Sequence, residues 1–401
     1  MSTRFACSLT ASSSLWPDVP TSRARDVLAA ARRGDLSAAI ADRHVLVATG
    51  SGGVGKTTVA ASLALAAAAQ GRRTIVLTID PARRLAQSLG LSSLDHRPRP
   101  VAGVDGLDAM MLDMKRTFDE LIERHAESRE RAHTITTNRF YQQMSSSLAG
   151  TQEYMAMEKL YELHTTGRYD LLVVDTPPTR NALDFLDAPR RLTDFLEGRF
   201  LRMFLTPGVA AGRVATRAVG VGTGVFMRAA SRITGSAVLA DLGAFFQSLD
   251  GMYEGFKERA QAVYRLLQSP ASGFVVVTTP EQHALREARF FLERLTQDGM
   301  PTAGLVVNRT TVPKLADQDA ATLSAAAGAL ASAPEHRAVA RLLGLAADDV
   351  AVASREQATL SRELHGLDPR VLIEIPQRPE DVHDLDGLAW VGRQLLGGPA
   401  T

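Results

Sequence analysis

Glycine, lysine and threonine are gathered in one short stretch of the chain, GSGGVGKTT at residues 50–58. The glycines let backbone N–H groups close around phosphate oxygens without a clash from Cβ atoms. Lys56 can reach the β- and γ-phosphates of a nucleotide, and the Thr57 hydroxyl can ligate Mg²⁺. The alternative is a glycine-rich turn with a surface lysine. The pattern predicts a phosphate-binding loop made of Gly50, Ser51, Gly52, Gly53, Val54, Gly55, Lys56, Thr57 and Thr58.

Two aspartates follow apolar runs and add to this chemistry. Asp175 follows DLLVV at residues 170–174, and its carboxylate would hold Mg²⁺ through a water molecule. Asp80 follows RTIVLTI at residues 73–79, and it could accept a hydrogen bond from a water in line with the γ-phosphate. The simpler alternatives are a loop that starts with an acid at Asp175 and an ordinary helix entry at Asp80. The sequence predicts Lys56 and Asp80 as the catalytic residues.

The phosphate-binding loop needs a strand before it and a helix after it. An apolar run at residues 44–49 supplies the strand, and a long helical segment begins at Lys56. Further apolar runs predict strands at residues 73–79, 107–113, 170–174, 274–279, 304–308 and 371–375. Helical segments separate most of them, so we expect an α/β fold, a P-loop NTPase with a mostly parallel, doubly wound sheet. In such sheets ligands bind at the carboxyl ends of the strands, which places Asp80 on the same edge as the loop.

Two helical stretches, residues 115–165 and 184–270, predict a helical subdomain inserted between strands. The Leu, Phe and Met spacing in residues 184–270 favours core packing over a groove for a client protein. Residues 314–364 are rich in Ala and also predict helix, with a loop near Ala333-Pro334. We expect a tail and short helix at residues 1–42, a single P-loop domain at residues 43–396 and a tail at residues 397–401.

The composition limits the classes of partner and compartment. The net charge of this 401-residue chain is +1, so nucleic acid is not expected as a partner. Its one cysteine, Cys7, allows neither a disulfide within the chain nor a cysteine metal site, which fits a reducing cytosol. No run of about 18 apolar residues predicts a transmembrane helix. Residues 1–25 are rich in Ser and Arg and favour a disordered tail over a transit peptide. We therefore expect a cytoplasmic protein, with peripheral membrane association as an option.

Five motifs in order resemble those of the ArsA family of ATPases: GSGGVGKTT, TIDPARRL, VVDTPPT, VVNR and IPQRPEDVHDLDGL. That family includes the ATPase of the arsenite pump and the ATPase that targets tail-anchored membrane proteins. The resemblance covers residues 44–396 and implies a dimeric ATPase that uses ATP and Mg²⁺. It implies that Asp80 positions the attacking water, that Asp175 lies beside Mg²⁺ and that Asn308 reads adenine. Nucleotide contacts from Arg309 and Pro376 are implied as well.

The sequence also departs from the family pattern. Relatives carry a second lysine directly after the first glycine of the loop, and it reaches the phosphates of the partner chain; here that residue is Ser51. The cysteines that bind arsenite or zinc in relatives have no counterpart, which disfavours arsenite transport. The second switch reads Thr179-Arg180-Asn181 in place of Thr-Gly-His.

The Ser51 departure leaves two kinds of function open. The chain could be an ATP-hydrolysing switch, as a homodimer or as a heterodimer with a paralogous ATPase that bears the lysine. It could instead be a nucleotide-dependent binding subunit with weak or no hydrolysis. In either case a membrane protein is a candidate client. A partitioning ATPase is disfavoured by the long 184–270 insertion, and a nitrogenase-type reductase by the lack of cysteines.

Overall fold

The computed structural model describes residues 34–79, 84–139, 141–142, 151–176, 253–367, 369 and 371–398. These residues form an eight-stranded sheet with the strand order β3-β4-β2-β5-β1-β6-β7-β8. All neighbouring strands pair in parallel except β3 and β4. The strands are β1 (Val45–Thr49), β2 (Thr74–Thr78), β3 (Arg99–Pro100), β4 (Leu107–Met111), β5 (Leu171–Asp175), β6 (Ser272–Thr278), β7 (Thr302–Thr310) and β8 (Leu372–Pro376). The predicted α/β fold with a mostly parallel sheet is confirmed.

The central strands are short, continuous apolar runs. Every residue of β1, β2, β5 and β6 is buried, as expected for a parallel sheet that is covered on both faces. The strand predicted at residues 107–113 is shorter, because Asp113 instead caps the following helix and accepts a hydrogen bond from the Arg116 backbone. The antiparallel β3 was not predicted, since two residues are too few to show a periodicity.

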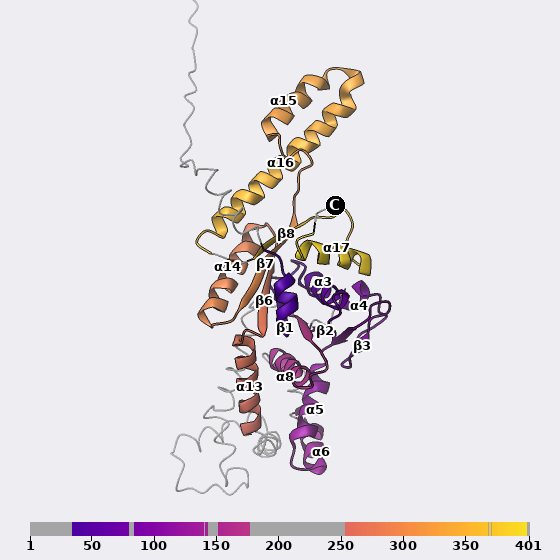
Figure 1. Ribbon diagram of the computed structural model, residues 1–401, viewed down its shortest axis with the longest axis vertical. Helices are drawn as coiled ribbons and strands as arrows, with labels where there is room; N and C mark the ends of the chain where they lie inside the picture. Colours follow the sequence, from indigo (N-terminus) through magenta and orange to yellow (C-terminus); the bar gives the residue numbers. More distant parts are fainter. Residues whose placement is uncertain are drawn as a thin grey trace, which may run out of the picture.

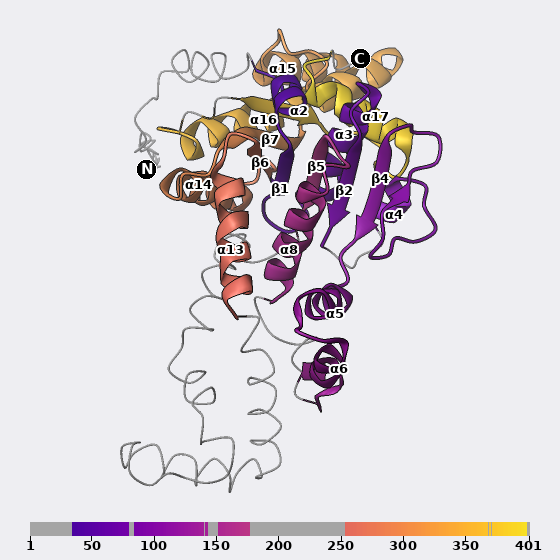
Figure 2. The same ribbon diagram turned by 60° about the horizontal axis from the view of Figure 1, so that its bottom comes forward.

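Helices cover both faces of the sheet (Figure 1 and Figure 2). One hydrophobic cluster joins the sheet to α2, α3, α4 and α17, and another joins it to α5, α6, α8, α13 and α14. Their bounds are α2 (Ser37–Asp42), α3 (Lys56–Ala69), α4 (Arg84–Ser88), α5 (Met114–His125), α6 (Arg129–Thr137), α8 (Thr151–Thr165), α13 (Tyr253–Gln268), α14 (Gln282–Gln297) and α17 (Leu385–Leu395). The short helix α2 belongs to this packing, because Leu36 and Ile40 are fully buried.

The connection from β7 to β8 forms a helical hairpin that extends away from the sheet (Figure 1). Its helices are α15 (Ala320–Ala331) and α16 (Arg337–Glu363), and the 3-10 helix η2 (Pro334–His336) joins them. The structure thus agrees with the helices predicted at residues 314–364 and with the loop predicted near Ala333-Pro334.

Only part of the predicted helical subdomain falls within the described residues. Helices α5, α6 and α8 lie in the first stretch and α13 lies in the second, whereas residues 177–252 are outside the described part, as are residues 1–33. A buried ion pair joins α8 to α13, with 2.9 Å between Arg259 Nε and Glu158 Oε1. None of the helices that the structure describes is long and apolar enough to cross a membrane.

Candidate functional site

The phosphate-binding loop connects the buried strand β1 to helix α3, and its backbone requires glycine at two points. Gly50 has a φ of 150°, and a Cβ atom there would lie 2.0 Å from the Val277 carbonyl oxygen. Gly55 has a φ of 97°, and a Cβ atom there would lie 2.3 Å from Asn308 Nδ2. The loop lies directly against β6 and β7, so there is no room for a Cβ atom at either position, and both residues must be glycine. Its N–H groups and the start of α3 form a surface suited to phosphate.

Lys56 and Thr57 are the first two residues of α3 and are held by different partners. The Lys56 ammonium is buried and donates to the Ser51 carbonyl oxygen at 2.7 Å. The Thr57 hydroxyl donates to Asp175 Oδ2 at 2.8 Å, and the Thr78 hydroxyl donates to the same oxygen at 3.0 Å. The structure therefore brings together Lys56, Thr57 and Asp175, which come from β1–α3 and from the end of β5.

The donor set at Thr57 and Asp175 fits Mg²⁺ in the form used by nucleotide-binding proteins. Mg²⁺ prefers oxygen ligands and is usually held by one or two protein groups together with substrate phosphates. The Thr57 hydroxyl gives its hydrogen to Asp175, so the lone pairs of its oxygen point elsewhere and can meet a cation. The described residues contain no cluster of three or more His, Cys, Asp or Glu side chains suited to an all-protein metal cage. Thr57 and Asp175 would thus share the cation with nucleotide phosphates.

Asn308 and Arg309 lie near the end of β7, beside the loop. Asn308 Nδ2 donates to the Val54 carbonyl oxygen at 2.9 Å, so this side chain supports the loop directly. Arg309 has a left-handed backbone with a φ of 62°, and the β7–β8 register shifts between Asn308 and Thr310. A β-bulge of this kind turns a side chain out of the sheet. Here it places Arg309 at the wall of a cavity.

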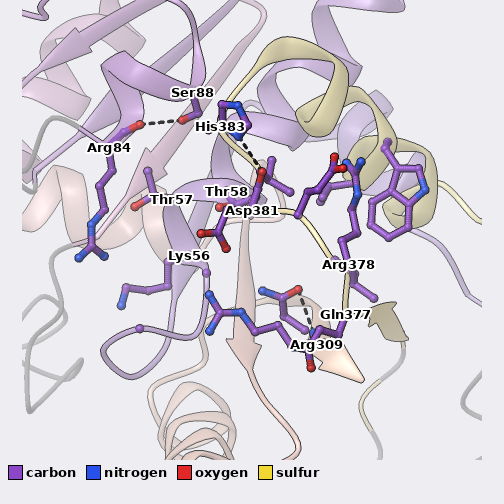
Figure 3. Close-up of a pocket in the computed structure, with 18 of the residues that line it drawn as sticks. Lys56, Thr57, Thr58, Arg84, Ser88, Arg309, Gln377, Arg378, Asp381 and His383 are labelled. Atoms are coloured by element: carbon purple, nitrogen blue, oxygen red, sulfur yellow. Dashed lines mark hydrogen bonds between the residues drawn. The ribbon is translucent and has the colours of Figure 1, made fainter. Parts of the chain in front are cut away.

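That cavity has a volume of about 570 Å³ and runs along the carboxyl edge of the sheet from the loop to the segment after β8. Figure 3 shows Lys56, Thr57 and Arg84 toward one end and Arg378 toward the other. At the second end the Arg378 guanidinium lies over the Trp390 ring, 5.1 Å from its centroid. Pro376 also lines this end. The cavity joins a cationic, phosphate-binding end to an end with an aromatic ring and a proline.

Several residues at the cavity were not among the sequence-predicted site residues. They are Arg84, Gln87, Ser88, Thr176, Arg378, Asp381, His383 and Trp390. Arg84 had a weak signal, because it follows Asp80 by one helical turn. Trp390 had none, because it reaches the cavity only through the packing of α17. Asp80 and Arg180 themselves lie outside the described residues.

Comparison with known proteins points to one family. A family model described as anion-transporting ATPase matches residues 43–329, which include the loop, both predicted aspartates and Asn308. The chain is 27% identical to the ATPase GET3 of Malassezia globosa over 66% of this chain and 72% of that protein. It is 29% identical to the ATPase ARSA2 of Chlamydomonas reinhardtii, over 66% of this chain and 67% of that one. An uncharacterized protein of Streptomyces coelicolor is 36% identical over 46% of this chain and 45% of its own length.

Proposed function

Because the chain belongs to the anion-transporting ATPase family and is an ATPase, we propose that it is a Mg²⁺-dependent dimeric switch that couples its nucleotide state to a partner or client protein. The observation that carries this proposal is the 2.8 Å contact between Thr57 and Asp175 beside the buried Lys56. It gathers the groups for phosphate and for a divalent cation at the carboxyl edge of the sheet, where α/β sheets bind ligands.

Each site residue has a distinct role in the proposal. Lys56 and the loop N–H groups bind the β- and γ-phosphates, and Thr57 with Asp175 would hold Mg²⁺, Asp175 through water. The cation would neutralise charge on the phosphate oxygens during transfer. Asp80 orients the attacking water. Asn308 and Arg309, beside the loop, and Pro376, toward the other end of the cavity, would contact the base and sugar.

Helix α8 and helix α13 offer a route from the nucleotide to a partner. Helix α8 leads into β5, which ends at Asp175, and α13 leads into β6, which pairs with β1. The buried Glu158–Arg259 pair ties the two helices together. A change at Asp175 on ATP hydrolysis would therefore act on both helices at once, which is how packed elements transmit small shifts.

The proposal is tested by Mg²⁺-dependent ATP turnover and by partner capture. The purified chain, incubated with a cell extract, should retain a partner with a non-hydrolysable ATP analogue and release it with ADP. Turnover should vanish with a chelator and fall at least 100-fold in Asp175→Asn. No turnover under any condition, or capture that is the same with both nucleotides, would contradict it. A membrane-protein client and a cytoplasmic location are part of the proposal.

Ser51 favours a second candidate, a nucleotide-dependent binding subunit whose partner performs hydrolysis. A hydroxyl cannot supply the charge that relatives bring across the dimer from this position. Asp80→Asn with radiolabelled ATP discriminates the two candidates. Loss of phosphate release with ATP binding intact places catalysis in this chain. Unchanged turnover of a complex with a lysine-bearing paralogue supports the binding subunit.

A further inference from the structure

Exposed apolar side chains are concentrated on the hairpin between β7 and β8. Among the described residues, the exposed large hydrophobic side chains are Phe290, Val312, Leu315, Val339, Leu342 and Leu345. All except Phe290 belong to the hairpin or to the segment that leads into it. Leu342 and Leu345 are 65% and 63% exposed, although they lie one turn apart on the same helix. A paired stripe of this kind on a soluble protein usually marks an interaction surface.

The hairpin cannot bury this stripe by itself. Its own core cluster consists of Leu323, Ala347 and Val350, separate from the clusters of the sheet. Helix α15 has the sequence AATLSAAAGALA, without a charged residue, and only Leu323 is buried. Two helices packed around so few residues form a single layer, whereas stable helical units bury their apolar faces between layers.

The root of the hairpin, in contrast, is firmly attached beside the cavity. The Thr311 backbone and hydroxyl both donate to the Glu356 carboxylate, at 2.8 Å and 2.9 Å. Arg289 of α14 donates to the backbone oxygens of Glu363 and His365, both at 3.0 Å. Because the root is fixed, the hairpin extends from the sheet in a defined direction (Figure 1).

The charges around the stripe identify its occupant. Arg341 lies one turn before Leu345, and Asp348 and Asp349 lie one turn after it. All three are exposed, and none forms an ion pair within the described part of the chain. In an antiparallel pair of α16 helices, a two-fold axis between Leu342 and Leu345 would pack Leu342 on Leu345 of the second copy. The same axis brings Arg341 within one turn of the second copy's acidic pair.

The charge on α16 also favours one orientation of the pair. A parallel pairing would set Arg341 against Arg341, which like-charge repulsion disfavours. The self-complementary pattern therefore matches an antiparallel copy of the same helix.

We propose that this face of α16 binds the same face of a second copy of the chain, so that two hairpins form an antiparallel four-helix bundle. Helix α16 lies beyond the range matched by the family model. The interface lies outside the nucleotide cavity and needs no ATP. The interface would hold two chains together while their cavities open and close. The proposal does not depend on whether the chain hydrolyses ATP.

The molar mass of the nucleotide-free chain tests this proposal. Light scattering and sedimentation should show a dimer without nucleotide. The double variant Leu342→Glu with Leu345→Glu should raise the dissociation constant of the dimer about 100-fold or more, which corresponds to about 2.8 kcal/mol. The matched control is Phe290→Glu, which places the same charge at an exposed phenylalanine of α14 and should leave the dimer intact. A wild-type chain that is monomeric without nucleotide would overturn the proposal.

A charge exchange separates a second copy from any other occupant. Arg341→Asp and the double change Asp348→Arg with Asp349→Arg should each weaken the dimer, because like charges then face each other. An equimolar mixture of the two variants should associate again, since every cross-pair regains opposite charges. Failure of the mixture to associate would exclude the antiparallel copy. These residues are exposed, so circular dichroism should be unchanged, and ATP turnover measured in parallel reports on the proposed function separately.

Discussion

At the scale of single residues, the cations of the cavity are placed for different tasks. Lys56 is buried and tied to the loop, and Arg378 is stacked on Trp390 at the opposite end. The Arg84 guanidinium has no hydrogen-bond partner or ion pair in the described structure and extends toward the Lys56 end of the cavity (Figure 3). We therefore expect Arg84 to be the cation that meets a terminal phosphate.

Replacing Arg84 should therefore slow hydrolysis more than it weakens binding. A free guanidinium near the γ-phosphate can stabilise the charge of the transition state, a contribution that reaches 10³–10⁵ in other phosphoryl-transfer enzymes. We expect Arg84→Ala to lower kcat about 100-fold, with the KM for ATP changed less than about threefold, and Arg84→Lys to recover part of kcat. Steady-state kinetics checks this.

Arg378→Ala is the matched control at the other end of the cavity, and it should raise KM while kcat stays near the wild-type value. A kcat of Arg84→Ala within a factor of two of wild type would show that this guanidinium acts elsewhere.

Short-range motifs made part of the site predictable. The glycine, lysine and threonine spacing of residues 50–58 placed the loop, and the apolar run before Asp175 placed this carboxylate at a strand end. Arg84 and Trp390 were missed, because their approach depends on how α4 and α17 pack on the sheet. The outward turn of Arg309 depends on a β-bulge, and no residue type in the sequence predicts that bulge.

At the scale of elements, an ion pair links the starts of two neighbouring strands. Asp170 lies just before β5, and Arg73 lies just before β2. Asp170 accepts one hydrogen bond from the Arg73 backbone N–H at 2.9 Å and one from the Arg73 guanidinium at 2.6 Å. The Arg73 hydrogen bonds lower the pKa of Asp170 to about 2. The ionised form is therefore favoured by folding.

Asp170→Asn should destabilise the protein at neutral pH and less so in acid. Since the folded pKa, about 2, lies below the ordinary value of 3.8, the stabilisation is present at pH values well above 3.8 and is lost as the pH falls through about 2. The pair is partly exposed, so we expect Tm to fall by only about 1–3 °C at pH 7. Thermal unfolding between pH 7 and pH 3 should show the difference shrinking, whereas Asp105→Asn, in an exposed loop, should show none.

The strands and helices were easier to predict than their surroundings. Continuous apolar runs identified β1, β2, β5 and β6, because parallel strands are buried on both faces. The Ala-rich composition identified the two helices of the hairpin. It could not indicate that Leu342 and Leu345 face solvent, since the same spacing also describes a buried stripe.

At the scale of the whole molecule, the two proposed contacts between chains have separate tasks. The α16 faces would join the chains with or without nucleotide, and the nucleotide cavities would respond to ATP. Ser51 then determines how much each cavity can contribute to its partner's phosphates, because relatives place a lysine at this position.

Ser51→Lys tests that relation directly. The Lys56 ammonium donates to the backbone carbonyl oxygen of Ser51, so a change of the side chain at residue 51 leaves this hydrogen bond intact. Ser51 is not among the described residues with a positive φ, so a lysine fits its backbone. We expect Ser51→Lys to raise the turnover of the chain alone about tenfold or more, because the added charge stabilises the transferred phosphoryl group. Ser51→Ala, which adds no charge, should leave turnover unchanged.

A Ser51→Lys chain no faster than wild type would mean that the site is complete without a charge from this position, and that a lysine-bearing paralogue is not required.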